Sequence, residues 1–261
     1  MKSNTVTLYI NSKDRANINN PSTNFTYNIF PLGVYNATSF FVKSASIPLS
    51  NYVTVYPPIS GTNQTFEITN FLNTYTIPVP AGNYTAQQLA TTIQNAINAL
   101  VSPTVFGVLY NTNTNTFEIT TTLSSDINFT VNNAAYPYQS LGSVMGFRDI
   151  NHNPIDTGSI SAITSPFEAS LSGPLCYYIK SNTLSVSTNS FFQKNKSNVI
   201  CSIPNNQGPF SVLAFLNPAP IYEPLFNVSI SQLDFQLVDE YGNEIILNDD
   251  WVITISIQCD V

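Results

Sequence analysis

Short segments in which apolar and polar side chains alternate run through most of this sequence. A two-residue period places the apolar side chains on one face of an extended chain, as in a half-buried β-strand. Gly, Pro and Asn separate the segments at spacings typical of a sandwich or a jelly roll. The predicted strands are Val6–Ile10, Phe40–Ser46, Thr65–Thr69, Thr116–Thr120, Ile127–Val131, Cys176–Lys180, Val199–Ile203, Val228–Val238 and Trp251–Gln258.

One segment departs from this pattern and predicts a helix. Its apolar residues recur at helical spacing: Leu89, Ile93, Ala96, Ile97 and Leu100. Thr85 is the expected N-cap, Gln88 completes a capping box, and Pro103 ends the segment. We expect one principal helix near Thr85 to Leu100, with one face against a sheet. The length of 261 residues fits one domain over 1–261, with a helix-containing insertion around 84–103.

The C-terminal part of the sequence predicts a β-hairpin. Residues Leu233–Val238 alternate, Glu240–Asn243 have the composition of a turn, and Ile245–Leu247 resume the strand pattern.

Charged residues are scarce, at 9% of the chain, and the net charge is −7. Nucleic-acid binding depends on clustered Lys and Arg, so this composition argues against a nucleic-acid partner. Neutral polar side chains cost less to bury than Lys or Glu, which suits a chain packed against other subunits. An AT-rich genome, which enriches Asn and Ile codons, is the alternative explanation of this composition.

The N-terminal residues lack the apolar run of a secretory signal, and no stretch approaches the ~20 apolar residues of a membrane span. We therefore expect the protein to be made and kept in the cytosol of a cell. Cys176, Cys201 and Cys259 are odd in number and far apart, which favours free buried thiols over disulfides or a metal site.

The sequence contains few residues of the types that enzymes use in catalysis. His152 is the single histidine, and its Asn-rich setting predicts a surface turn. Five acidic residues cluster near the C-terminus, and their spacing matches no EF-hand loop, although a calcium ion there stays open: Asp239, Glu240, Glu244, Asp249 and Asp250. A carboxylate pair for glycoside hydrolysis also stays open. We expect no catalytic residue, no cofactor and no metal, and hence no enzyme.

Several short segments, taken in order, span nearly the whole chain: Lys13–Arg15, Asn20–Phe25, Val42–Pro48, Asn51–Tyr52, Ile77–Thr85, Met145–Phe147, Leu233–Leu237, Asp239, Gly242 and Asp250–Trp251. Together they resemble one protein family, the penton (minor capsid) proteins of virophages and polinton-like viruses. The resemblance implies a single jelly roll, an antiparallel β-sandwich with one principal helix and loop insertions. It also implies homopentamers at the fivefold vertices of an icosahedral capsid, and it carries no catalytic residue over.

Several further expectations follow from this resemblance. The partners would be other copies of the chain and neighbouring hexamers or trimers of a double jelly-roll major capsid protein. The place would be the capsid vertex of a virion assembled in the cytoplasm of an infected host cell. Lys13, Arg15, Phe191 and Phe192 are the candidate subunit-interface residues. The alternative functions are a glycan- or receptor-binding β-sandwich, such as a spike or fibre head that contacts a host-surface receptor, and a hydrolase on a β scaffold.

Overall fold

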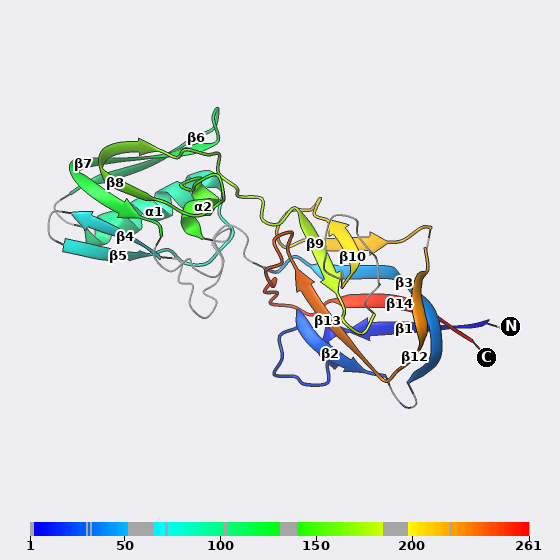
Figure 1. Cartoon of the computed structure of the whole chain (residues 1–261). Helices are drawn as coiled ribbons and strands as arrows, with labels where there is room; N and C mark the ends of the chain where they lie inside the picture. Colours follow the sequence, from blue (N-terminus) through cyan, green and yellow to red (C-terminus); the bar gives the residue numbers. More distant parts are fainter. Residues whose placement is uncertain are drawn as a thin grey trace. The chain divides into compact units, whose positions relative to one another are not determined.

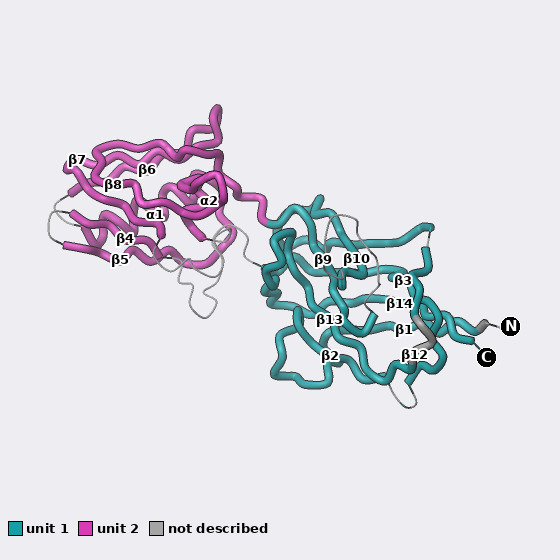
Figure 2. Tube along the Cα trace, in the orientation of Figure 1, with its two compact units in different colours: residues 1–51, 174–261 teal, residues 52–173 magenta. Residues whose placement is uncertain are grey.

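The structure is a computed structural model that divides the chain into two compact units. Unit 1 comprises Met1–Asn51 and Pro174–Val261, and unit 2 comprises Tyr52–Gly173 (Figure 2). The structure describes residues 3–29, 31, 33–51, 65–70, 73–101, 104–130, 140–184, 198–219 and 221–260.

Unit 1 consists of two antiparallel sheets. Sheet I has the order β1-β14-β3-β11, with β12 also paired to β3, and sheet II has the order β10-β9-β13-β2 (Figure 1). The strands are β1 (Ser3–Asn11), β2 (Asn24–Asn28), β3 (Val34–Pro48), β9 (Cys176–Lys180), β10 (Val199–Pro204), β11 (Val212–Leu216), β12 (Glu223–Ile230), β13 (Gln232–Val238) and β14 (Val252–Asp260). A 3-10 helix, η1 (Ser12–Asp14), follows β1.

The strand order identifies unit 1 as a jelly roll. When β1, β2, β3, β9, β10, β11, β13 and β14 are numbered from one to eight, the sheets have the orders 1-8-3-6 and 5-4-7-2. The pairs 1:8, 2:7, 3:6 and 4:5 are antiparallel, so the chain folds as one long ribbon of strand pairs that rolls into two sheets. The predicted fold class, a single jelly roll with one principal helix, is confirmed.

The core of unit 1 lies between the two sheets. Alternating residues from both contribute to it, among them Ile10, Ile253 and Ile255 from sheet I and Phe235 and Leu237 from sheet II, all nearly or fully buried. The apolar residues of the alternating sequence pattern are therefore those on the inner face of each sheet.

The described part of unit 2, which is inserted between β3 and β9, is one antiparallel sheet with two helices. The sheet has the order β5-β4-β7-β6, and β8 also pairs with β7. The elements are β4 (Thr65–Asn70), β5 (Asn73–Pro78), α1 (Ala86–Leu100), β6 (Phe106–Asn111), β7 (Thr116–Asn128), α2 (Leu141–Met145) and β8 (Asp156–Thr164). Its hydrophobic core is separate from that of unit 1 and lies between the sheet and the helices.

Helix α1 begins and ends where the sequence predicts. Thr85 Oγ1 accepts from Gln88 N at 3.3 Å, and Gln88 Oε1 accepts from Thr85 N at 2.9 Å, so both bonds of the capping box are present. The helix also completes the hydrogen bonding of strand β6. Asn98 exchanges two bonds with the backbone of Phe106, and Val108 N donates to Gln94 Oε1 at 2.9 Å.

Replacing Thr85 with alanine is expected to destabilise unit 2 by about 1 kcal/mol, because a helix N-terminal amide loses its acceptor. Chemical denaturation followed by the helical far-UV signal measures this loss. Thr91→Ala is the matched control, since Thr91 is an exposed residue in the interior of the same helix, where alanine is a better helix former. Equal stability of Thr85→Ala and the wild-type protein would contradict the capping role.

The domain organisation differs from the expectation of one domain over 1–261 with an insertion around 84–103. The inserted unit is much longer, Tyr52–Gly173, and has a core of its own. The sequence pattern that predicts α1 lies within a few residues. The strands β4–β8 belong to unit 2 only because they pair with one another, and no local pattern in the sequence reveals that pairing.

Three strand boundaries also differ from the predictions. The predicted strand Thr116–Thr120 and the first two residues of the predicted strand Ile127–Val131 lie in one strand, β7, which ends at Asn128. Phe129 and Thr130 follow the strand, and Val131 lies outside the described residues. The predicted strand Val228–Val238 is two strands, β12 and β13, which pair in different sheets. In the C-terminal hairpin the turn is present, but in place of a strand over Ile245–Leu247 there is a bridge between Val238 and Glu244 and a bond from Ile245 N to Leu237 O.

All three cysteines are free thiols. Cys201 and Cys259 are buried, whereas Cys176 is only half-buried, contrary to the prediction of burial. Burial raises the pKa of the Cys201 thiol to about 12, so this side chain behaves as a small apolar group at neutral pH. Among the described residues, neither helix combines the length and apolar sequence needed to cross a bilayer.

Candidate assembly surface

The outer face of sheet I carries two neighbouring rows of uncharged side chains, which we name the neutral face. The strand register places Tyr9, Thr254, Ser44 and Leu216 in one row and Asn11, Val252, Ser46 and Ala214 in the other. The row between them, which includes Ile10 and Ile253, points into the core, so both outer rows face away from it.

The neutral face exposes large apolar side chains at its two edges. Tyr9 is 73% exposed on β1, and Leu216 is 69% exposed on β11, at opposite ends of the same row. Lys43 lies beside this row at a β-bulge of β3. Interface cores are depleted in charged residues and enriched in aromatic ones, so the neutral face has the composition of a surface that another protein can cover at low desolvation cost.

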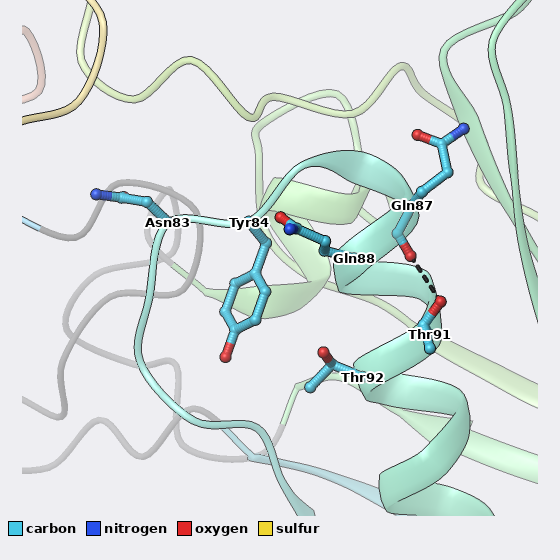
Figure 3. A pocket seen from close by; sticks show the side chains of 6 residues that line it. All are labelled: Asn83, Tyr84, Gln87, Gln88, Thr91 and Thr92. Carbon is cyan, nitrogen blue, oxygen red and sulfur yellow. Dashed lines mark hydrogen bonds between the residues drawn. The ribbon is translucent and has the colours of Figure 1, made fainter.

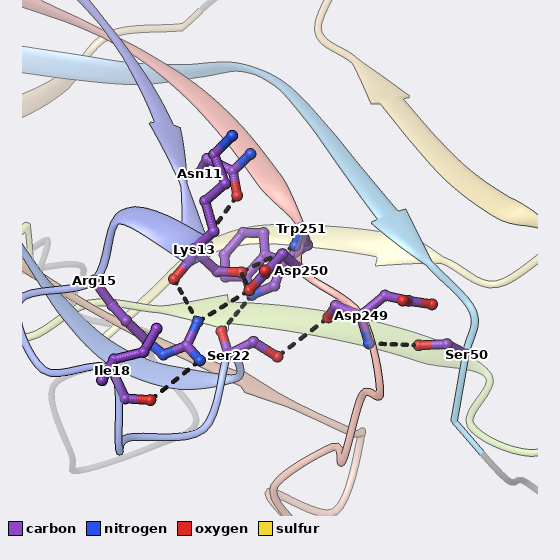
Figure 4. Close-up of polar contacts among 10 residues, drawn as sticks. Asn11, Lys13, Arg15, Ile18, Ser22, Ser50, Asp249, Asp250 and Trp251 are labelled. Atoms are coloured by element: carbon purple, nitrogen blue, oxygen red, sulfur yellow. Dashed lines mark hydrogen bonds and ion pairs between the residues drawn. The ribbon is translucent and has the colours of Figure 1, made fainter.

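Arg15 lies in an internal hydrogen-bond network at one corner of unit 1 (Figure 4). Its Nη1 donates to Ser12 O at 2.9 Å and forms an ion pair with Asp250 Oδ1 at 3.0 Å, and its Nη2 donates to Ile18 O. Ser12 Oγ donates to the same Asp250 oxygen at 2.7 Å and accepts from Trp251 N at 3.0 Å. The network therefore fastens the end of β1 to the start of β14.

Two of the segments that resemble penton proteins meet in this network. Arg15 and Asp250 are 235 residues apart in sequence and in direct contact in the fold. The Arg15 side chain is only 14% exposed, and that of Asp250 is 41% exposed, so the pair contributes modestly as an ion pair and chiefly positions the chain.

The predicted interface residues are thus placed as follows. Lys13 is exposed on η1, and its backbone N donates to Asn11 Oδ1. Arg15 is turned inward in the network described above. An interface role stays a prediction for both. Phe191 and Phe192 lie outside the described residues. The neutral face was not predicted, because its rows exist only once four strands from distant parts of the sequence are in register.

The acidic residues near the C-terminus serve separate structural purposes. Asp239 accepts from the backbone of Tyr241 and Asn243 and closes the hairpin turn, while its burial raises the pKa of its carboxyl group. Glu244 accepts from Thr23, and Glu240 accepts from Leu175 N. Within the part of the chain that the structure describes, no group of three or more His, Cys, Asp or Glu is arranged to hold a metal ion.

His152 lies in a loop of unit 2 with a positive φ of 65°. Its Nδ1 contacts Nη1 of Arg148, whose guanidinium carbon lies 5.3 Å from the centre of the Phe167 ring. Burial, followed by the positive charge of Arg148, lowers the pKa of the imidazole. In a nucleophile–His–acid triad a carboxylate orients the imidazole, whereas here a guanidinium contacts Nδ1.

Other segments of the resemblance also occupy structural joints. Gly146 ends α2 in the left-handed region with φ 87°, and its N–H donates to Gly142 O and Ser143 O. Tyr84, before α1, donates from its hydroxyl to Pro80 O at 2.9 Å. Both residues therefore shape a turn or a helix end.

The fold defines a jelly-roll protein with a sheet-and-helix insertion. No protein-family model matches the sequence, and no curated protein matches it either. Among solved structures, the chain is similar to the crystal structure of the mavirus penton protein, with 13% sequence identity and a TM-score of 0.44 over 100% of both chains. It is likewise similar to the cryo-EM structure of the Sputnik virophage, with 14% identity and a TM-score of 0.44 over 98% of both chains.

Proposed function

We propose that this chain is a viral structural protein, a penton that forms homopentamers at the fivefold vertices of an icosahedral capsid. The observation that carries the proposal is the complete jelly-roll strand order of unit 1, an architecture that recurs in viral capsid proteins. In this role the chain belongs to the virion, assembles in the cytoplasm of the infected cell, and contacts hexamers or trimers of a double jelly-roll major capsid protein.

Two further observations support a structural role. The penton-like segments lie at joints of the fold, where Arg15 meets Asp250 and where Gly146 ends α2. The neutral face offers a wide, uncharged flank on sheet I. A closed ring needs two different flanks that fit head to tail, and we assign one of them to the neutral face.

The size of the particle in solution tests the pentamer. Light scattering coupled to size exclusion, or native mass spectrometry, is expected to give about five times the subunit mass of 28.7 kDa. A monomer or a trimer at every concentration, with or without major capsid protein, would overturn the homopentamer and favour the receptor-binding alternative.

A charge placed on the neutral face is expected to prevent ring formation. In Leu216→Lys the new ammonium group would be buried without a partner at every one of the five contacts, at a cost of several kcal/mol each. Ile150→Lys is the matched control, because Ile150 is an apolar side chain in unit 2 that is 81% exposed and lies outside the neutral face. The assay is pentamer formation and incorporation into shells. Normal assembly of Leu216→Lys would exclude this face as a flank.

A further inference from the structure

A cavity of about 490 Å³ lies in unit 2 between the N-terminal half of α1 and the loop that leads into it. The described residues that line it are Asn83, Tyr84, Gln87, Gln88, Thr91 and Thr92. Figure 3 shows the Tyr84 ring beside the helix, with Gln88 and Thr92 on the helix side of the ring. The volume lies within the range of small-molecule sites in proteins.

The Tyr84 ring is held in place before any ligand arrives. Its hydroxyl donates to Pro80 O at 2.9 Å, and its ring packs against the core of unit 2. Gly82 allows this position, because a Cβ atom there would lie 2.9 Å from Cε2 of the ring. The ring is therefore a fixed aromatic platform that loses little conformational entropy on binding.

The other lining side chains are neutral and have mixed hydrogen-bonding capacity. Gln88 uses its Oε1 to cap the helix, and its amide nitrogen carries two N–H donors. Thr91 donates its hydroxyl to Gln87 O at 2.9 Å and retains lone pairs that accept. Thr92 adds a second hydroxyl, and Gln87 and Asn83 add a second and a third side-chain amide. None of the described side chains that line the cavity carries a formal charge.

This combination selects one ligand chemistry. A pyranose ring presents C–H groups on its faces, which pack on an aromatic ring, and hydroxyl groups around its edge, which both donate and accept. Ionic ligands such as phosphates or sialic acid are bound most strongly by cationic side chains, and the described residues of this lining include no Lys or Arg. We propose that the cavity is a binding site for a neutral carbohydrate, with the sugar packed against Tyr84 and its hydroxyls bonded to Gln88 and Thr92.

The site is independent of the proposed capsid role, since it lies wholly within unit 2 and requires only that this unit is folded. Saturation-transfer NMR on the full-length protein tests it, with methyl β-galactoside, methyl α-mannoside and N-acetylglucosamine as neutral probes and N-acetylneuraminic acid as the anionic probe. At least one neutral probe is expected to bind saturably at millimolar concentration, and the anionic probe is not.

Two variants locate the binding. Thr92→Arg fills the cavity and is expected to weaken binding by about tenfold or more, and Tyr84→Ala removes the platform with a similar loss. Ala99→Arg is the matched control, because Ala99 lies exposed on the same helix, near its C-terminal end and outside the lining. Far-UV circular dichroism verifies that each variant is folded. The proposal is overturned if none of the neutral probes binds, if the anionic sugar binds in preference, or if folded Thr92→Arg binds as the wild type does.

Discussion

Replacing Gly146 with alanine is expected to destabilise unit 2 strongly and to leave unit 1 intact. Gly146 has a φ of 87°, a conformation that costs an L-residue about 1 to 2 kcal/mol. An alanine Cβ would also lie 2.0 Å from Phe167 O, a backbone atom that cannot move away alone. Phe167 N donates to Gly146 O at 3.2 Å, so relieving the clash breaks this contact as well. The expected loss is at least about 3 kcal/mol, a large share of a domain's stability.

A second glycine separates the two causes of this loss. Gly158 also has a positive φ, 63°, but no atom lies within 4 Å of the position that a Cβ would take there. Gly158→Ala is therefore expected to cost about 1 kcal/mol, from the backbone alone. Hydrogen exchange of the α1 peptides reports unit 2, and the fluorescence of the single tryptophan, Trp251, reports unit 1. If Gly146→Ala were no more damaging than Gly158→Ala, the close approach of Phe167 would not be a constraint.

Replacing Trp251 with alanine is expected to produce the reverse pattern, with loss of unit 1 and retention of unit 2. The indole is 1% exposed and makes edge contacts with Phe25 and Phe235, at centroid distances of 5.9 and 6.3 Å. Its Nε1 donates to Ser22 O at 2.7 Å, which holds the segment between η1 and β2. Truncation of a buried tryptophan costs about 3 to 5 kcal/mol, and here a carbonyl also loses its donor.

Hydrogen exchange over both units measures this outcome without the tryptophan signal. Peptides of β14 and β13 are expected to lose protection, while those of α1 and β7 keep it, since the two cores share no residue. Val252→Ala is the matched control, because Val252 is the next residue and points to the neutral face. Loss of protection in α1 along with β14 would show that the two units unfold as one, contrary to their separate cores.

Local features of the fold were predictable because their causes lie within a few residues. The capping box joins Thr85 and Gln88, three positions apart, so helix α1 could be placed nearly to the residue. A two-residue alternation likewise identifies a strand with one buried face, and it located β1, β4, β9, β10 and β14 to within a few residues. The scarcity of charged residues also argued against a nucleic-acid partner, and the single histidine argued against a catalytic triad, from the sequence alone.

Which strands pair, and therefore where one unit ends and the other begins, was decided only by the tertiary structure. Predicted strands of both units look alike in sequence, because alternation reports a buried face and not the partner that buries it. The insertion Tyr52–Gly173 is defined by pairing among β4–β8, and the neutral face by the register of β1, β14, β3 and β11. The internal hydrogen-bond network of Arg15 likewise exists only because the fold brings Asp250, 235 residues away in sequence, beside it. The cavity beside Tyr84 depends in the same way on how a loop lies against a helix, since a hollow is a property of packing and leaves no periodicity in the chain.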